Sequence, residues 1–245
     1  MTSAIITGAA RGIGAACATT FVEAGWSVVA VDRDAESLEA ACAGFGDAAI
    51  AVAGDASQRA TNEKAVRVAL DRFGHLDAVV GNAGVNLPKL IDDTSDADFE
   101  WLMAVNVKAL VYLAQVAHQP LAESRGSFTI VASKTGLVAQ RNSPVYVATK
   151  GAAVQLARAL ALDWAPEQIR VNAICPGIVD TPMLQEFIDG LPDPDQAWRE
   201  HREAQPLGRL ATAAECAAAV LFLASPAASF ITGVALPVDG GFTAE

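Results

Sequence analysis

Tyr146 and Lys150 stand four residues apart in the segment PVYVATKGAAVQLARAL, residues 144–160. Ser143 followed by Pro144 is a typical helix start, with a capping serine and then a proline at the first position. Residues four apart on a helix share a face, so the phenol and the ammonium would be neighbours. A nearby cation favours the phenolate and lowers the phenol pKa from about 10. Such a tyrosine could exchange a proton with an alcohol or a carbonyl, although the same spacing is also common in surface pairs.

Two more polar residues could complete a catalytic group. Ser133 ends the apolar run 126–133, and the carboxyl ends of parallel strands meet where α/β ligands bind. A serine hydroxyl at that position could hold a substrate oxygen as charge develops on it. Asn106 lies among apolar residues inside the helical pattern DFEWLMAVNVKALVYLAQ, and a buried amide needs partners. Those partners could be backbone groups or a buried water, and a water chain to Lys150 would carry protons outward.

A glycine-rich turn, TGAARGIG, spans residues 7–14 between an apolar run and a helical pattern. This is the context in which such glycines bind the pyrophosphate of a dinucleotide. Gly8 would permit a tight turn, Gly12 would let the backbone approach the phosphates, and Gly14 would let the helix lie close to the sheet. The free N–H groups at the helix start would then face the phosphates.

Asp32 ends the second apolar run, 20 residues after Gly12. A carboxylate at that position could accept hydrogen bonds from both hydroxyls of the adenosine ribose, and it would repel a 2′-phosphate. This favours NAD over NADP, unless Asp32 only begins a turn in the sequence DRD. Arg11 and Arg33 lie close enough in sequence to pair with a 2′-phosphate, which keeps NADP as the alternative. Asp55 ends the third run at the same height and could touch the adenine.

Seven β-rich runs alternate with about six helical patterns, which predicts one doubly wound α/β domain over residues 1–245. Alternation of this kind gives a mostly parallel sheet with right-handed crossovers and helices on both faces. Several runs are apolar without alternation, as expected of strands that are covered on both sides. The seven expected strands lie at residues 4–7, 27–32, 48–55, 76–84, 126–133, 170–177 and 234–241.

Residues 178–208 depart from this rhythm, because two helical pieces surround residues 190–196. An insertion after the carboxyl end of a strand lies where α/β ligands bind. We expect it to act as a lid on the site, with an ordinary surface excursion as the alternative.

Composition and charge bound the class of partner. The net charge of −11 disfavours nucleic acid and anionic membranes. The apolar runs look too short for a membrane span, and the N-terminus carries no basic segment before its apolar stretch, so we expect a cytoplasmic protein without a signal peptide. The four cysteines form no CxxC pair and have no histidine at ligand spacing, which predicts buried thiols and no metal site.

The combination of motifs resembles that of a classical short-chain dehydrogenase/reductase across nearly the whole chain. The motifs are TGAARGIG, GNAG (residues 81–84), Asn106, Ser133, YVATK (residues 146–150), PG (residues 176–177) and VDGG (residues 238–241). The resemblance implies a seven-stranded Rossmann fold, a Ser133–Tyr146–Lys150 catalytic group extended by Asn106, and a homotetramer. GNAG departs from the family by its first glycine, where asparagine is common, and Lys134 departs from it by following the catalytic serine.

The resemblance also implies how the site is used. Lys150 would bond the nicotinamide ribose as well as the tyrosine, and Tyr146 as phenolate would take the proton of a secondary alcohol while hydride leaves for NAD. The residues expected to bind the cofactor are Gly8, Arg11, Gly12, Ile13, Gly14, Asp32, Arg33, Asp55, Ala56, Asn82, Ala83, Gly84, Tyr146, Lys150, Pro176, Gly177, Ile178, Val179 and Thr181.

Polar residues near the catalytic group suggest a small hydroxylated substrate: a sugar, polyol or sugar acid. Ser133 and Tyr146 would hold the reacting oxygen, while Asn86, Lys134 and Gln140 would contact the rest, because a pocket for a fatty chain should be mainly apolar. Lys134 is the least secure of these, since neighbouring strand residues point to opposite faces.

Other functions remain open at this stage. A 3-oxoacyl carrier-protein reductase could use the same scaffold with NADPH, and the arginines at 199, 202 and 209 could then dock the carrier. A catalytically idle dinucleotide sensor is disfavoured by the intact catalytic group. An extended epimerase is disfavoured because no substrate domain is seen before residue 245, and enoyl reductases space the tyrosine and lysine more widely.

Overall fold

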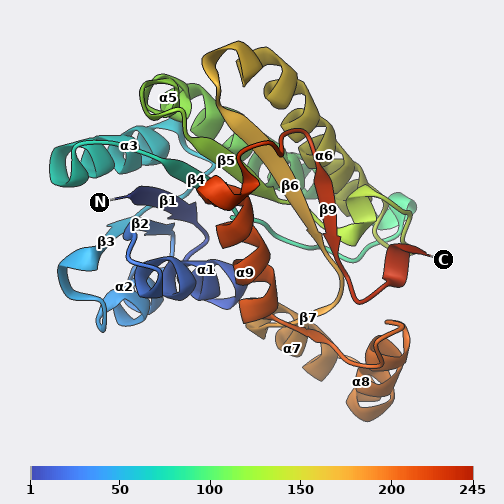
Figure 1. Cartoon of the computed structure of the whole chain (residues 1–245). Coiled ribbons are helices and arrows are strands. Elements are labelled where there is room, and N and C mark those ends of the chain that lie inside the picture. Colours follow the sequence, from blue (N-terminus) through green and yellow to red (C-terminus); the bar gives the residue numbers. More distant parts are fainter. Residues whose placement is uncertain (1, 245) are drawn as a thin grey trace.

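The computed structural model describes residues 2–244, in which a central parallel sheet lies between two layers of helices (Figure 1). The strand order is β3-β2-β1-β4-β5-β6-β9, and every neighbouring pair is parallel. This confirms the expected Rossmann sheet, whose order changes direction between β1 and β4 and so opens a crevice at their carboxyl ends. The strands are β1 Ser3–Thr7, β2 Ser27–Asp32, β3 Ala49–Ala53, β4 Ala78–Gly81, β5 Ser127–Val131, β6 Arg170–Pro176 and β9 Ala235–Val238.

Several strands end earlier than the apolar runs predicted. β4 stops at Gly81, three residues before the expected end, because Asn82 turns its side chain back onto the first turn: its Nδ2 donates to the carbonyls of Thr7 and Gly8 at 2.8 and 3.1 Å. β9 likewise stops at Val238. The residues that follow these strands leave the hydrogen-bonded ladder and are free to line the crevice.

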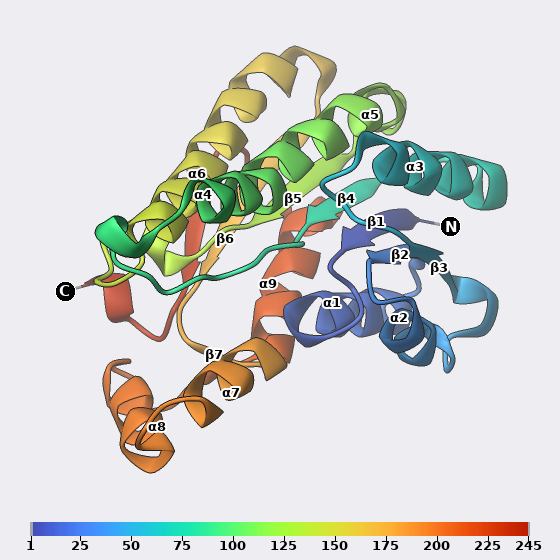
Figure 2. The same ribbon diagram turned by 180° about the vertical axis from the view of Figure 1, so that it is seen from behind.

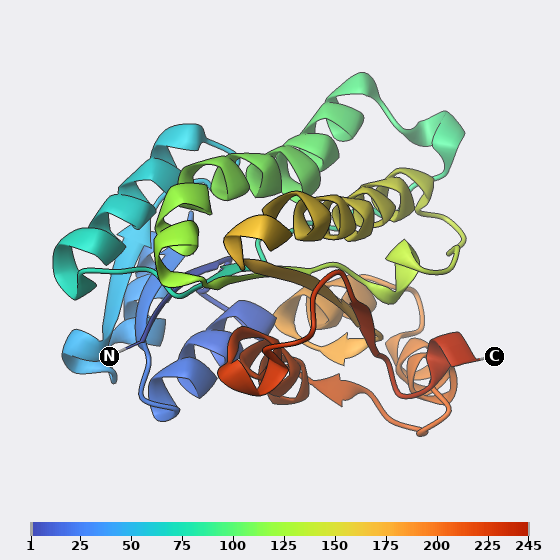
Figure 3. The ribbon, with the colours of Figure 1, turned by 45° about the horizontal axis from the view of Figure 1, so that its top comes forward.

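Six helices cover the sheet, with α1, α2 and α9 on one face and α3, α5 and α6 on the other (Figures 1 and 2). From above, α5 and α6 run side by side across their face (Figure 3). Three further helices lie within the described residues: α7 and α8 are the two helical pieces expected in segment 178–208, and α4 precedes α5 in the segment that was expected to be one helical run. The bounds are α1 Gly12–Glu23, α2 Ala35–Cys42, α3 Arg59–Phe73, α4 Asp96–Met103, α5 Ala109–Ser124, α6 Pro144–Trp164, α7 Pro182–Asp189, α8 Pro194–Glu203 and α9 Ala213–Ala224.

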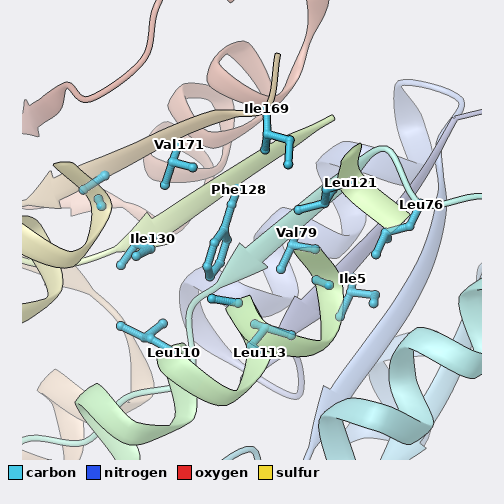
Figure 4. Close-up of a cluster of buried hydrophobic side chains, with 14 of the residues drawn as sticks. Ile5, Leu76, Val79, Leu110, Leu113, Leu121, Phe128, Ile130, Ile169 and Val171 are labelled. Atoms are coloured by element: carbon cyan, nitrogen blue, oxygen red, sulfur yellow. The ribbon is translucent and has the colours of Figure 1, made fainter. Parts of the chain in front are cut away.

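Two buried clusters, one on each face of the sheet, fix the positions of the helices. Figure 4 shows the first, where Phe128 from β5 lies between Leu110 of α5 and Val171 of β6. The second joins α1 to α9, and Phe21 is fully buried in it. Full burial of such a side chain contributes about 1.5–3 kcal/mol. All four cysteines are buried and free, as the sequence predicted: Cys17, Cys42, Cys175 and Cys216.

Within residues 2–244, one helical stretch, Asp96–Ser124, is long and apolar enough by length and composition to cross a membrane. The expectation that all apolar runs are too short was therefore wrong for this stretch. It comprises α4, one π-helical turn at Ala104–Lys108 and α5, and it packs against α3 and α6. Its apolar residues include Leu110 and Leu113 of the first core cluster, so in this fold the stretch serves as a core element.

Candidate active site

A cavity of about 740 Å³ opens at the carboxyl ends of the strands, between the halves of the sheet. Of the residues predicted to bind cofactor or substrate or to act in catalysis, all but Gly14 and Asn106 line it. The lining predicted residues are Gly8, Arg11, Gly12, Ile13, Asp32, Arg33, Asp55, Ala56, Asn82, Ala83, Gly84, Asn86, Ser133, Lys134, Gln140, Tyr146, Lys150, Pro176, Gly177, Ile178, Val179 and Thr181.

The glycine turn has the geometry that its sequence predicted. Gly8 and Gly12 both adopt positive φ, +67° and +59°, which side chains rarely tolerate. A Cβ on Gly14 would lie 2.0 Å from the carbonyl oxygen of Gly8, so only glycine allows α1 to begin this close to β1. A Cβ on Gly12 would meet nothing nearer than Thr181 at 3.5 Å, so this stretch of backbone is open towards the cavity.

Asp32 is held in one orientation at the end of β2. Its Oδ2 accepts from the backbone N–H of Ala10 at 3.0 Å, and its Oδ1 accepts from that of Asp34 at 3.1 Å. Arg11, which the sequence offered as a partner for a 2′-phosphate, instead pairs with Glu186 of α7 at 2.5 Å. Arg33, the second arginine offered for that role, lines the cavity next to Asp32 in the sequence.

The catalytic side chains come together from β5 and α6. Ser133 follows β5, and its Oγ accepts from both the N–H and the Oγ1 of Thr135 at 3.2 and 3.0 Å. With those acceptor sites used, the serine hydroxyl keeps its own proton to donate. Lys150 is buried, and its Nζ donates to the carbonyl of Val131 at 3.1 Å while lying 5.8 Å from the ring centre of Tyr146.

The expected lowering of the tyrosine pKa by Lys150 is not found in the protein alone. Burial raises the pKa of the Tyr146 phenol above its ordinary value, and a hydrogen bond with Ser133 only partly opposes this. Burial also lowers the pKa of Lys150 to about 8. Desolvation disfavours both charged forms. In the protein alone, Tyr146 is therefore a neutral phenol, and the Lys150 ammonium beside it loses its proton more readily than that of an ordinary lysine.

Asn106 holds two protein segments together through its side-chain amide. Its Oδ1 accepts from the N–H of Val85 at 2.8 Å, and its Nδ2 donates to the carbonyl of Val85 at 2.9 Å and to Thr149 Oγ1 at 3.1 Å. Thr149 Oγ1 in turn donates to the carbonyl of Tyr146 at 2.7 Å. One buried side chain thus fastens the loop after β4 to the helix that carries the tyrosine.

Ser143 begins α6 as predicted, but it does not cap the helix with its side chain. The residue is 1% exposed and lines the cavity, and its Oγ has no hydrogen-bond partner among the described residues. The sequence signal, serine before proline, identified the helix start correctly and missed that this residue borders the cavity.

Lys134 borders the cavity, but its ammonium packs elsewhere. The Nζ lies 3.2 Å from the ring centre of Phe242, a residue that does not line the cavity. Burial lowers the pKa of Lys134 to about 8, and the charge of Asp239 opposes that shift. The structure therefore gives no support to the expected contact between this ammonium and the substrate.

The segment 178–208 forms α7 and α8 over the open side of the cavity, and Figure 2 shows both helices projecting beyond the main layers. Its apolar residues Met183 and Phe187, and the polar residue His201, line the cavity and were not predicted from the sequence. Two short strands, β7 Val179–Asp180 and β8 Ala211–Thr212, pair at its base and were also missed.

Gln205 fixes the base of this segment. It is 1% exposed, accepts from the N–H of Ile178 at 3.0 Å, and donates to the carbonyl of Arg209 at 2.7 Å. The hydrogen bonds of Gln205 therefore fix the ends of the segment that carries α7 and α8. The Arg11–Glu186 ion pair connects α7 to the glycine turn as well.

Comparison with known proteins places this site in a family. A family model described as enoyl-(acyl carrier protein) reductase matches residues 8–243. L-fucose dehydrogenase of Mus musculus is 41% identical over 241 residues, which cover 97% of this chain and 86% of that protein. The chain belongs to the short-chain dehydrogenase/reductase family.

Further relatives extend the range of names in the family. Meso-2,3-butanediol dehydrogenase of Serratia marcescens is 35% identical, with coverage of 98% of this chain and 94% of that protein. The crystal structure of a 3-ketoacyl-(acyl-carrier-protein) reductase from Brucella melitensis, complexed with NADH, superposes with a TM-score of 0.92 at 37% identity, covering 99% and 98% of the two chains. As a member of this family, the protein is an oxidoreductase that uses a nicotinamide dinucleotide and acts on CH–OH groups.

Proposed function

We propose that the protein is an NAD-dependent dehydrogenase that oxidises a secondary alcohol of a sugar, polyol or sugar acid. The observation that carries this proposal is the position of the catalytic group. Ser133, Tyr146 and Lys150 line the same cavity as the glycine turn and Asp32, together with further polar residues. The relatives named for L-fucose and for 2,3-butanediol support a hydroxylated substrate.

The glycine turn and Asp32 fit a dinucleotide, and they favour NAD. The open backbone at Gly12 and the start of α1 suit a pyrophosphate. The backbone N–H groups of Ala10 and Asp34 donate to the Asp32 carboxylate and hold it in one orientation. In that orientation it can accept hydrogen bonds from an adenosine ribose. A 2′-phosphate would meet that fixed negative charge, and Arg11 is already engaged by Glu186. When bound, the dinucleotide supplies the hydride acceptor.

The chain's own residues then handle the alcohol oxygen and its proton. Ser133 donates a hydrogen bond to that oxygen, because Thr135 occupies its acceptor sites. Tyr146 takes the alcohol proton as the hydride leaves the carbon, and Lys150 stabilises the phenolate that must form first. Lys150 is buried and Tyr146 is half-buried at the cavity, so the lysine lies behind the tyrosine side chain that meets the substrate.

Other polar residues of the cavity support a polar substrate. Asn86, Gln140, Ser143 and His201 all border it. The lid also contributes apolar side chains, Met183, Leu184, Phe187 and Leu191. Apolar side chains suit an acyl chain, and a 3-ketoacyl-(acyl-carrier-protein) reductase is a structural neighbour. A ketoreductase that acts on acyl thioesters is therefore the second candidate.

Other features follow from the resemblance to the family. We propose a cytoplasmic homotetramer whose physiological direction is oxidation. In the single chain, Leu162 on α6 and Phe230 after α9 are 79% and 103% exposed. Apolar side chains this exposed are suited to burial between copies of the chain.

The test is a comparison of kcat/KM on the purified protein. L-fucose and meso-2,3-butanediol are assayed with NAD and with NADP, and a 3-oxoacyl thioester is assayed with NADH and with NADPH. The proposal expects the highest kcat/KM with a polyhydroxy substrate and NAD. Higher efficiency with the thioester would replace it by the second candidate.

A further inference from the structure

Ser143 occupies a helix cap position but does not use its side chain as a cap. The helices α4 and α9 begin with Ser95 and Thr212, whose hydroxyls accept from the N–H three residues on. The Ser143 Oγ makes no such bond, although the residue is 1% exposed. An unsatisfied buried hydroxyl is destabilising, so its retention at the wall of the substrate cavity calls for a ligand.

The backbone before α6 determines this arrangement. Asn142 adopts the left-handed conformation with φ of +59°, and Ser143 follows with φ of −155° and ψ of 43°. This turn directs Ser143 towards the cavity, three residues before Tyr146.

Asn86, which lines the same cavity, offers a second unsatisfied atom. Its Oδ1 is buried without a hydrogen-bond partner among the described residues, and the residue lines the cavity. Its neighbour Val85 is fastened to Asn106, and Asn106 is fastened through Thr149 to the carbonyl of Tyr146. Asn86 and Ser143 are therefore held on one frame with the catalytic tyrosine.

We propose that Ser143 and Asn86 are specificity-determining residues that hydrogen-bond a second hydroxyl of the substrate while Ser133 and Tyr146 hold the reacting one. This rests on the proposed function and narrows its substrate class to molecules with at least two hydroxyls. The Asn86 Oδ1 accepts from such a hydroxyl, and the Ser143 hydroxyl can donate to it or accept from it. A substrate with a single hydroxyl would leave both protein atoms unpaired, and sites of this kind reject such analogues strongly.

Ser143→Ala tests the proposal, with Ser95→Ala as a matched control that removes a true cap. Each variant is assayed with NAD on two pairs of probes: L-fucose against cyclohexanol, and meso-2,3-butanediol against 2-butanol. For Ser143→Ala, we expect kcat/KM to fall by about tenfold or more with whichever of L-fucose and meso-2,3-butanediol the wild type oxidises more efficiently. The fall in kcat/KM should be smaller with the mono-alcohol of the same pair. The Kd for NADH should stay within twofold of wild type.

Thermal stability separates this role from a structural one. Removing a working cap is destabilising, so Ser95→Ala should lower the Tm and leave the preference for polyols unchanged. Ser143→Ala should leave the Tm unchanged or raise it. Asn86→Ala should share the loss of polyol efficiency, and Asn86→Asp, which keeps an acceptor oxygen, should lose less.

The outcomes distinguish this proposal from the one on which it rests. If the wild type oxidises a polyol with NAD but Ser143→Ala stays within twofold of it, the role of Ser143 is refuted and the proposed function stands. A lowered Tm for Ser143→Ala with unchanged substrate preference would also refute it. If the wild type oxidises neither polyol, the proposed function itself is wrong and this inference falls with it.

Discussion

Replacing Asn106 with alanine should loosen the cofactor loop and the catalytic helix together, because one side chain holds both. The substitution removes the bonds to the N–H and the carbonyl of Val85, at 2.8 and 2.9 Å, and the bond to Thr149 at 3.1 Å. Both backbone groups of Val85 then lose the partners that the structure shows. Tyr146 also loses a support, because Thr149 is what links its carbonyl to the loop.

The expected loss of stability follows from the two orphaned backbone groups. A polar group left unsatisfied by such a change costs about 1–3 kcal/mol. Val85 is only partly buried, so the lower part of the range applies to each group, and the free energy of unfolding should fall by about 2–3 kcal/mol. For a chain of this length, that corresponds to a fall in Tm of about 4–12 °C. A displaced catalytic group should also reduce kcat/KM by about 10²-fold.

Asn172 provides a matched control for this experiment. Its Nδ2 donates to the carbonyl of Ile231 at 2.9 Å and its Oδ1 accepts from the N–H of Val234 at 3.1 Å, at a position that does not line the cavity. Asn172→Ala should therefore lower the Tm comparably and leave kcat/KM near the wild-type value. The two variants are compared by thermal unfolding and by initial rates of NADH formation. Asn106→Ala with a Tm within 2 °C of wild type, or with kcat/KM within twofold, would refute the reasoning.

Two further predictions concern the cofactor and the pH profile. Asp32→Ala should narrow the preference for NAD over NADP by about 5- to 1000-fold, since a charge pair about 4 Å apart repels by roughly 1–4 kcal/mol at a protein surface; an unchanged ratio of kcat/KM for the two dinucleotides would contradict the role of Asp32. Oxidation should become faster as pH rises towards the raised pKa of Tyr146, because the phenolate that takes the alcohol proton becomes more populated. Lys150→Met should move this rise to higher pH, because it removes the cation that favours the phenolate; a profile that coincides with that of the wild type would show that another group titrates.

Much of the fold and of the catalytic group could be predicted because the physical constraints on them are local. Apolar runs covered on both faces identified the strands, and the glycine turn requires positive φ at Gly8 and Gly12 whatever the rest of the chain does. The spacing of Tyr146 and Lys150 fixes their common face on one helix. Each of these signals lies within a few residues, so periodicity and residue type suffice to read it.

What could not be predicted depends on which distant groups meet in the folded chain. The partners of Asn106 lie 21 and 43 residues away, so the sequence left backbone and water equally open. Ser143 satisfies the local rule for a cap, and only the folded structure shows that it borders the cavity and that its hydroxyl has no cap partner. The predicted direction of the Tyr146 pKa shift was wrong, because burial opposes the effect of a nearby cation and depends on the whole fold.

The central claim is that Tyr146 transfers the proton in an NAD-dependent oxidation of a hydroxylated substrate. Its most direct test is the rate of NADH formation by wild type and by Tyr146→Phe with L-fucose or meso-2,3-butanediol, with NADH binding measured in parallel. We expect NADH formation by the wild type, a loss of about 10²–10⁴-fold in the phenylalanine variant, and unchanged NADH affinity. A phenylalanine variant that binds NADH normally and keeps a tenth of the wild-type rate would contradict the account.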